Sequence, residues 1–271
     1  MIHRLLRCAG GCAAAIGFAL MLASCGPAGR IDTDARDEFI LVAGASGRAG
    51  HYVIQHLNEQ GRNFRSLTRD ADRAVEKWGE DFRDMSWFEG DVRDPARMNE
   101  VMQGVSRVIC VIGANQISGP NSAEFVDYGG VRNLVDAAMK NEIEHFVLLT
   151  AIGVTDKNHP FNKATKGALE WRYKGEEYLR GSGLNYTIVR PGGLTNNPAG
   201  EQGVLIAQGD EWRKFLRSPL SRDDLALVLI AVLDEPGTRN ATFEIVNDPS
   251  VEIGVWRSAL AGLQADASTA Q

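Results

Sequence analysis

The chain of 271 residues has few cysteines and too few basic residues to balance its acids. It carries 29 Lys and Arg against 35 Asp and Glu, a formal net charge of −6. Because nucleic-acid-binding proteins usually need a basic face, this balance argues against that class. Of the four cysteines, Cys8 and Cys12 lie in an N-terminal stretch that resembles a signal, and Cys110 lies in an apolar run. One buried thiol cannot form an intramolecular disulfide, so the cysteines do not decide the redox compartment.

Two catalytic signatures are also missing. No G-x-S-x-G sequence occurs, which argues against a serine hydrolase on an α/β framework. Neither His145 nor His159 has a second His or Cys at ligand spacing, so the sequence predicts no metal site. We find no internal repeat, low-complexity block or long linker, which favours a single domain.

Residues 1–24 have the pattern of a secretory signal peptide. Arg4 and Arg7 precede an uncharged run from residue 8 to 23, which is shorter than the roughly 20 residues a spanning helix prefers. The run ends in Leu-Ala-Ser-Cys, which resembles the lipobox of bacterial lipoproteins. The resemblance implies that Cys25 is lipidated and becomes the first mature residue, with 25–37 as a tether. The alternative is a chance cysteine in an uncleaved or misassigned N-terminus.

From residue 38 onward, apolar strand-like runs alternate with stretches of helical period. This predicts an α/β fold, a Rossmann-like doubly wound parallel sheet with helices on both faces, over residues 38–267. Turn-rich sequence after Pro191 predicts that 191–267 form a small substrate-side extension. The expected strands are 39–43, 64–68, 85–88, 108–112, 146–149, 186–189 and 241–246; the expected helices are 49–59, 73–78, 95–102, 122–140, 165–179, one opened by Ser221, and 251–263.

Three glycines, Gly44, Gly47 and Gly50, directly follow the first strand and lead into a helix. A phosphate-binding turn needs glycine, because its backbone bends sharply and approaches an anion that a Cβ would block. The spacing is G-x-x-G-x-x-G, and the strand and helix around it distinguish it from a chance tight turn. The loop 44–50 therefore predicts dinucleotide binding, with the pyrophosphate against its backbone.

This loop resembles that of the short-chain dehydrogenase/reductase superfamily, particularly its atypical, NmrA-like and NAD(P)H-binding members. Segments 90–94, 182–194 and 221–226 resemble the same group in the expected order, so the similarity runs from residue 38 to 247. The resemblance implies that Asp91 contacts the adenine, with Val92 beside it. A cofactor would lie across the carboxyl ends of the strands.

The end of the second strand indicates which cofactor is bound. An acid there would bind the ribose hydroxyls of NAD, whereas an arginine would pair with the 2′-phosphate of NADP. The strand ends in Arg69, and Arg48 lies inside the glycine loop. Two guanidinium groups favour NADP, since arginine pairs with phosphate bidentately. The alternative is that Arg69 is solvated and Asp70 takes the hydroxyls of NAD.

The catalytic residues of the superfamily are only partly present. Ordinary members use a Tyr-x-x-x-Lys pair, and the resemblance aligns Lys174 with its lysine. Glu170 then stands where the tyrosine would be, and only this position supports it as a substitute acid. The resemblance implies that Lys174 holds the nicotinamide ribose, with a plain surface lysine as the alternative. The catalytic hydroxyl of the fifth strand is Thr150 or is replaced by Ala151.

These observations predict an NADPH-dependent oxidoreductase that acts on a small acceptor, such as a flavin or quinone, that needs no protein acid. The lost tyrosine leaves a second hypothesis, a non-catalytic NADP(H)-binding sensor or scaffold. A nucleotide-sugar epimerase is disfavoured by the short substrate region. The predicted catalytic residues are Lys174 and Thr150, and the predicted cofactor-binding residues are Gly44, Ser46, Gly47, Arg48, Ala49, Gly50, Arg69, Asp91, Val92 and Lys174.

The predicted location and the predicted cofactor disagree. NADPH is a cytoplasmic cofactor, yet the N-terminus predicts a lipoprotein outside the cytoplasm, attached to a membrane only through Cys25. The chain has no twin-arginine pair for export of a folded, loaded protein. Either the domain works outside the cytoplasm, or the start is misassigned and the protein is cytoplasmic. The sequence does not predict an oligomeric state.

Overall fold

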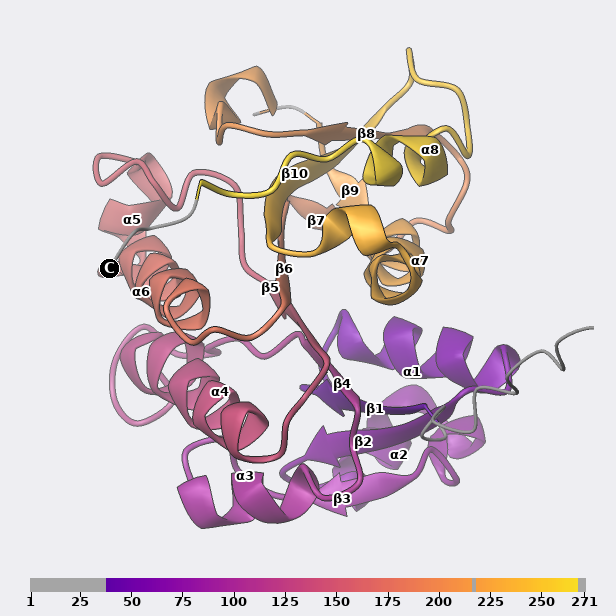
Figure 1. Cartoon of the computed structure of the whole chain (residues 1–271), viewed down its shortest axis with the longest axis vertical. Coiled ribbons are helices and arrows are strands. Elements are labelled where there is room, and N and C mark those ends of the chain that lie inside the picture. The colour runs from indigo at the N-terminus through magenta and orange to yellow at the C-terminus, as the bar shows by residue number, and fades with distance from the viewer. Residues whose placement is uncertain (1–37, 216–217, 268–271) are drawn as a thin grey trace, which may run out of the picture. The chain divides into compact units, whose positions relative to one another are not determined.

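The computed structural model describes residues 38–215 and 218–267. Its main sheet has eight strands in the order β3-β2-β1-β4-β5-β6-β10-β8 (Figure 1), and all neighbouring pairs are parallel except β10 with β8. This confirms the predicted Rossmann-like sheet. The strands are β1 Phe39–Ala43, β2 Asn63–Thr68, β3 Trp87–Glu89, β4 Arg107–Cys110, β5 His145–Leu149, β6 Tyr186–Pro191, β8 Gly203–Ala207 and β10 Ala241–Asp248, with β7 Leu194–Thr195 and β9 Leu220–Ser221 as a separate parallel pair.

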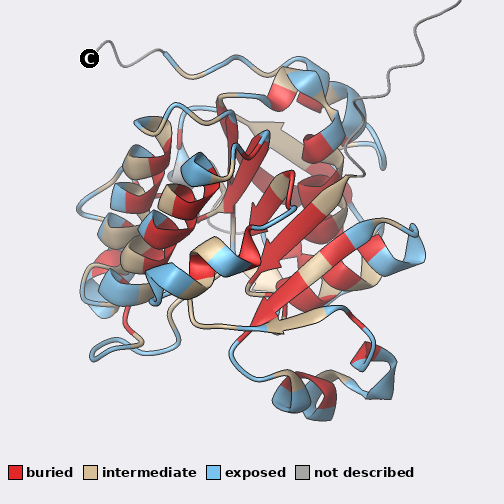
Figure 2. Ribbon diagram, turned by 60° about the horizontal axis from the view of Figure 1, so that its bottom comes forward, coloured by how far each residue is buried: buried red, intermediate tan, exposed pale blue. Residues whose placement is uncertain are grey.

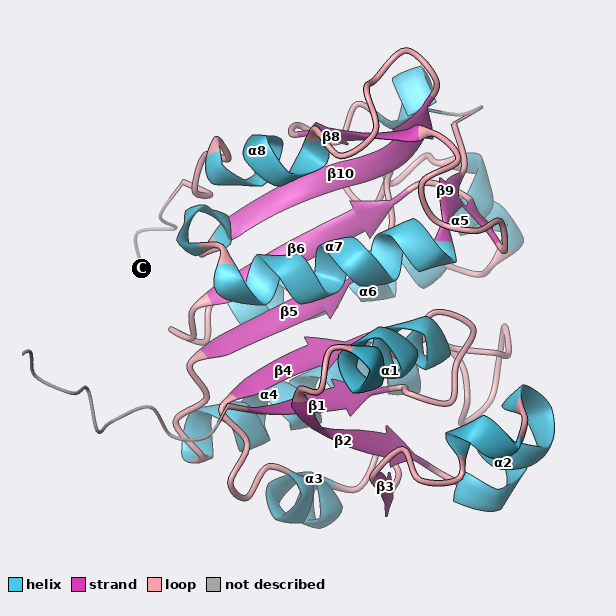
Figure 3. Cartoon of the chain, turned by 90° about the vertical axis from the view of Figure 1, so that its right-hand side faces the viewer, coloured by secondary structure: helices cyan, strands magenta, loops and turns pink. Residues whose placement is uncertain are grey.

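Helices cover both faces of the sheet (Figure 3). On one face lie α1 and α7, and on the other α3, α4 and α6. The α-helices are α1 Gly50–Glu59, α2 Ala71–Trp78, α3 Pro95–Val101, α4 Val131–Lys140, α5 Pro160–Ala164, α6 Ala168–Arg180, α7 Arg222–Asp234 and α8 Trp256–Ala261; the 3₁₀ turns are η1 Glu80–Phe82, η3 Trp212–Phe215 and η4 Pro236–Thr238, and η2 Glu124–Gly130 is a π-helix.

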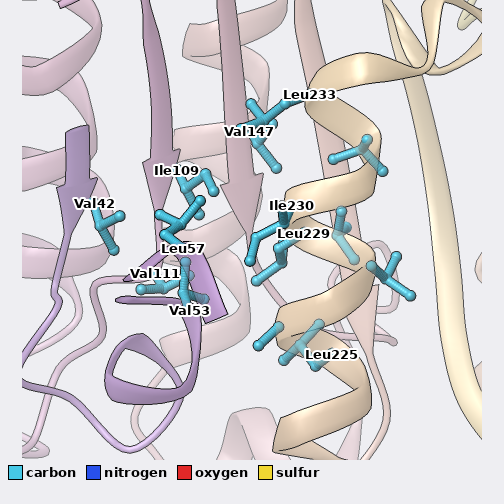
Figure 4. Packing of buried hydrophobic residues seen from close by; sticks show 14 of the residues in the cluster. Val42, Val53, Leu57, Ile109, Val111, Val147, Leu225, Leu229, Ile230 and Leu233 are labelled. Atoms are coloured by element: carbon cyan, nitrogen blue, oxygen red, sulfur yellow. The ribbon is translucent and has the colours of Figure 1, made fainter. Parts of the chain in front are cut away.

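The core consists of two apolar clusters, one on each face of the sheet, and the central strands are largely red in Figure 2. Successive residues of a strand point to opposite faces, so Val42 packs in one cluster and Leu41 in the other. Figure 4 shows Leu57 of α1 beside Ile109 of β4, and Leu229 of α7 belongs to the same cluster. Complete burial of such a side chain stabilises the fold by about 1.5–3 kcal/mol. The clusters fix α1 and α7 against the strands whose ends form the site.

Three helices differ from their predicted form, one of them the predicted helix 251–263, which is helical only over Trp256–Ala261. The predicted helix 122–140 is a π-helix over Glu124–Gly130 and becomes α-helical only at Val131. The wide turn places Asp127 so that its carboxylate accepts the backbone N–H of Ala114, 2.9 Å away. The predicted helix 165–179 begins at Ala168, because Lys166 and Gly167 have φ values of 52° and 88°. In contrast, Ser221 caps α7 as predicted, accepting the N–H groups of residues 223 and 224.

The N-terminal predictions concern residues that the structure does not describe. The signal peptide 1–24, the lipidated Cys25 and the tether 25–37 all lie outside the described residues. Within the described ranges, none of the helices is long and apolar enough to cross a membrane.

Candidate functional site

The glycine loop, residues 44–50, connects β1 to α1 and needs its glycines for space. Gly44 has φ 90°, and a Cβ there would stand 2.9 Å from the carbonyl oxygen of Val111. A Cβ on Gly50 would stand 2.2 Å from the Gly44 oxygen, and one on Gly47 would stand 3.0 Å from it. Real side chains cannot approach a backbone oxygen at 2.2 Å. The backbone of this loop is therefore bare on its inner side and close to the end of β4.

Neighbouring side chains hold the loop in place. The indole Nε1 of Trp78 donates to the Ser46 carbonyl at 3.0 Å, and the Thr68 hydroxyl donates to the Ser46 Oγ at 2.8 Å. The His51 ring stacks on Trp78 with centroids 3.6 Å apart, and its Nδ1 lies 3.1 Å from the Gly47 oxygen. Burial lowers the pKa of His51, which favours the neutral ring in this position. The loop is thus fixed before any ligand arrives.

A cleft of about 1160 Å³, called here the large cleft, runs from the glycine loop past the ends of β4 and β5. Such a crevice at the carboxyl ends of parallel strands is the usual ligand site of an open α/β sheet. Cations dominate its ionisable lining. The basic residues are Arg48, Arg69, Arg73, Lys77, Arg172 and Arg222, and the acidic ones are Asp70 and Asp127.

Four of these cations surround the outer side of the glycine loop without a carboxylate partner in the described part of the chain: Arg48, Arg73, Lys77 and Arg222. Burial, and then the charge of Arg48, lower the pKa of both Lys77 and Arg222. Arg222 is only 8% exposed and donates to two neutral acceptors, the Thr195 oxygen at 3.0 Å and Asn196 Oδ1 at 2.6 Å. A cluster of uncompensated cations is expected to bind a highly charged anion.

A smaller pocket of about 150 Å³ adjoins the large cleft beside β2 and β3. Arg69, Asp91 and Val92 line it together with Asn121, whose Oδ1 accepts from the Arg69 guanidinium at 3.2 Å. Hydrogen bonds from the Arg93 guanidinium, 2.5 and 2.8 Å long, hold the pKa of Asp91 below its usual range. The structure thus brings predicted cofactor residues from two separate loops, after β2 and after β3, to one pocket.

At the other end of the large cleft, Thr150 follows β5 and is 8% exposed. Its hydroxyl donates to Glu176 Oε1 at 2.7 Å. Glu176 is completely buried and pairs with Arg190 at 2.6 Å and Arg180 at 3.1 Å. Thr150, Arg190 and Arg180 all donate hydrogen bonds to the Glu176 carboxyl group. Thr150 is therefore held as part of a buried charged network.

Lys174 does not line the large cleft. Its side chain is 45% exposed, its Nζ lies 3.6 Å from Glu170 Oε1, and it stacks over the Trp171 ring at 3.9 Å. Arg172, two residues earlier on α6, lines the cleft instead. Its Nε donates to Asp127 Oδ1 at 2.7 Å, and Asp127 is 4% exposed. The structure thus brings Thr150 and the glycine loop to one cleft and leaves Lys174 and Glu170 outside it.

Five ionisable residues at the cleft were not predicted from the sequence as site residues: Arg172, Asp127, Arg222, Arg73 and Lys77. Arg222 lies inside the segment that resembles the superfamily's late helix, so this segment could have drawn attention to it. Arg172 lies one turn before Glu176 and one turn after Ala168, which also lines the cleft. The helical period could have suggested this face, but only the packing of α6 selects it.

Neither metal nor thiol chemistry is indicated at the site. Within residues 38–215 and 218–267, no group of three or more His, Cys, Asp or Glu could hold a metal ion. Cys110 is fully buried at the end of β4, and this burial raises the pKa of its thiol to about 12. A thiol that stays protonated at neutral pH is a poor nucleophile.

The sequence and the fold are similar to those of known proteins. The model of a family described as NAD(P)H-binding matches residues 44–236. Sanguinarine reductase of Eschscholzia californica is 28% identical, over 78% of this chain and 89% of its own length. The NAD(P)H azoreductase of Xenophilus azovorans is 26% identical, over 82% and 74%. An oxidoreductase of Lactococcus lactis, 21% identical, superposes with a TM-score of 0.69 over 83% of this chain and 97% of that one, a likeness of fold.

Proposed function

The chain belongs to the NAD(P)H-binding family, and we propose that it is an NADP(H)-dependent oxidoreductase that reduces a small acceptor. One observation carries the proposal: a single cleft joins the fixed glycine loop, an unpaired cluster of cations and the polar end of β5. A nicotinamide dinucleotide has a pyrophosphate, a possible 2′-phosphate and a redox-active ring in the same order. Two relatives, sanguinarine reductase and the azoreductase, carry reductase names, which supports reduction as the reaction class.

The residues present fit this cofactor. The bare backbone of the glycine loop would hold the pyrophosphate, and the pocket with Asp91 and Val92 would hold the adenine. When bound, the nicotinamide would supply a hydride to the acceptor. The chain's own residues bind and orient both partners, and the buried network under Thr150 keeps the end of β5 rigid.

We propose NADP rather than NAD because the acid next to the second strand is already used. Asp70 Oδ1 accepts the backbone N–H of Arg73 at 2.9 Å and caps α2, so its carboxylate is engaged. Arg48 and Arg69 remain for a 2′-phosphate. A charge-assisted pair of this kind contributes about 1.5–3 kcal/mol, or roughly 10- to 150-fold in affinity.

Purified full-length protein can test cofactor choice. Arg69→Asp should weaken NADPH binding by at least about 10-fold and leave NADH binding nearly unchanged. Arg83→Asp is the matched control, because Arg83 is exposed, pairs with Glu80 and lies outside the cleft. Equal losses for NADPH and NADH in Arg69→Asp would overturn the NADP assignment.

A second experiment separates a reductase from a sensor. NADPH consumption is followed by absorbance with a panel of quinones, flavins and aldehydes as acceptors. Turnover well above the protein-free rate supports the reductase. Tight NADPH binding without turnover for any acceptor would instead support the non-catalytic sensor. If neither NADPH nor NADH binds at millimolar concentration, both the reductase and the sensor hypotheses are wrong.

A further inference from the structure

We infer that Arg172 is a catalytic residue that holds the acceptor's oxygen, and that the acceptor is a conjugated carbonyl compound on an apolar ring system. This inference rests on the proposed reductase function and names the substrate class for the same cleft. It concerns the end of the large cleft near Thr150. It assigns a catalytic role to Arg172, a residue that the sequence resemblance did not single out.

Asp127 holds the Arg172 side chain in position through its Nε atom. Asp127, itself 4% exposed, accepts the Arg172 Nε at 2.7 Å through one oxygen and the Ala114 N–H at 2.9 Å through the other. The Nη2 atom lies 3.9 Å from where a Cβ on Gly113 would stand, beside the end of β4. In the described part of the chain, neither Nη atom has a hydrogen-bond partner. Both are free to bind a ligand in the cleft.

This end of the cleft lacks a proton donor for the reaction. Among the described residues, no tyrosine lines the large cleft or the small pocket. The Thr150 hydroxyl donates to Glu176, and the Thr165 hydroxyl donates to the Phe161 oxygen at 2.7 Å. Arginine cannot act as an acid near neutral pH because its pKa is too high. Arg172 can therefore stabilise negative charge but cannot neutralise it.

The large cleft also exposes apolar side chains. Ile117 is 55% exposed and Phe161 is 47% exposed, and both line the large cleft together with Leu149 and Leu194. Polar side chains such as Asn115 and Gln116 complete the lining. Large apolar side chains exposed at a cleft are expected to cover an apolar ligand. A cationic donor in a cleft with these apolar side chains suits a ring system that carries a reactive oxygen.

The chemistry balances without a protein acid. Hydride addition forms one new bond to the conjugated acceptor, and the electron pair displaced from its C=O bond moves onto oxygen. The hydride comes from a reduced nicotinamide, which is oxidised, and water supplies the proton that finally neutralises the oxygen. Conjugation lowers the energy of the intermediate anion, so an electrostatic partner is sufficient. Removal of one such donor typically slows a reaction about 100- to 1000-fold.

The decisive test uses 4-nitro-1-naphthol, a phenol whose colour reports its ionisation, bound to the full chain in the presence of NADP⁺. In the wild type the pKa of the bound phenol should lie at least about one unit lower than in Arg172→Gln, because a nearby cation favours the anion. Arg172→Lys should keep part of this shift. Arg132→Gln, at an exposed arginine of α4 outside the cleft, should keep all of it.

A kinetic readout accompanies the optical one. With 1,4-naphthoquinone, kcat should fall about 100-fold or more in Arg172→Gln, while the Kd for NADPH stays within a few fold. If this variant does not fold, Asp127→Asn/Arg172→Gln removes both charges of the pair and takes its place. An unchanged phenol pKa in a folded variant would overturn the inference, as would a loss in Lys174→Gln that Arg172→Gln does not share. Absence of NADPH binding by the wild type is a separate failure, that of the proposed function.

Discussion

At the glycine-loop end of the large cleft the cations lack carboxylate partners, whereas near Thr150 the charged side chains are buried and paired. Arg48 and Lys77 have no carboxylate partner in the described residues. Glu176, by contrast, is 0% exposed and pairs with two arginines. The two ends therefore gain from a ligand in different ways. The first end stores unfavourable electrostatic energy that an anion relieves, and the second already satisfies its own charges.

This difference has a functional consequence. The loop end determines affinity for a charged dinucleotide, so changes there should alter binding more than stability. The Thr150 end contributes to the stability of the fold, so changes in its buried network should alter stability more than binding. Three variants test this contrast, and a fourth concerns His145, which lies at the opposite end of β5 from Thr150.

The largest effect is expected from Arg190→Met. Arg190 is 5% exposed and bonds to Glu176 and Glu244, so its loss leaves the buried Glu244 without its arginine and Glu176 with Arg180 alone. The free energy of unfolding, measured by denaturant titration, should fall by about 3–5 kcal/mol. NADPH affinity of the folded fraction should change little. Lys214→Met, which breaks an exposed pair with Glu211, should cost less than about 1 kcal/mol. Similar losses in both variants would remove the contrast.

His145 should make stability depend on pH. It is 1% exposed at the start of β5, and burial, with the charges of Arg239 and Arg107, lowers its pKa from 6.5 to about 4. The unfolded chain then binds a proton between pH 6.5 and 4 that the native state does not. Stability is therefore fully retained above pH 6.5 and falls by about 3 kcal/mol as the pH drops to 4.

The control for this pH dependence is His145→Gln, which removes the titrating group and can keep the hydrogen bond to Thr187. The difference between the pH profiles of the wild type and the variant isolates the histidine. Parallel profiles between pH 4 and 6.5 would show that His145 titrates alike in both states.

Gly50→Ala should weaken NADPH binding and also lower the stability of the fold. The added Cβ would meet the Gly44 oxygen at 2.2 Å, so the loop must move. NADPH affinity should fall by about 100-fold, or about 2.8 kcal/mol, while unfolding loses about 1–3 kcal/mol. Gly181→Ala, which caps α6 with φ −77° and has no contact under 3.5 Å, should leave affinity unchanged. Retention of wild-type affinity in Gly50→Ala would show that the loop does not hold the cofactor.

The smallest effect is expected from Arg48→Gln. Removal of one cation from the unpaired cluster should weaken NADPH binding about 10-fold, or about 1.4 kcal/mol, with little effect on stability. The salt dependence of binding should also become shallower, since exposed charges are screened. If the variant and the wild type have the same NADPH dissociation constant at every salt concentration, Arg48 is excluded from the phosphate site.

The loop end could be predicted from the sequence because its information is local. A strand, three spaced glycines and a helix follow one another within twelve residues of chain, Phe39–Gly50, and each is required by the close backbone approach at Gly44. Thr150 could also be predicted, since it directly follows a buried strand. Helix caps such as Ser221 depend on a few neighbouring residues and were equally readable.

The rest of the site depends on contacts between distant segments. Residues 172 and 174 lie about 200° apart around a helix, and only packing decides which one faces the cleft. Gly175 sets this orientation. A Cβ there would stand 2.9 Å from the backbone carbonyl oxygen of Asp127, because α6 packs closely on η2. The antiparallel strand β8 was missed for the same reason. Its pairing with β10 joins Gly203 to Asp248, which no local pattern indicates.

The most direct test of the account is a crystal structure of the full chain with NADP⁺. We predict that pyrophosphate oxygens accept hydrogen bonds from N–H groups of residues 44–50, and that the 2′-phosphate lies within hydrogen-bond distance of Arg48 or Arg69. The nicotinamide should lie at the end of the cleft lined by Thr150 and Arg172. A dinucleotide bound elsewhere, or bound in reverse with its nicotinamide in the pocket of Asp91, would contradict the account.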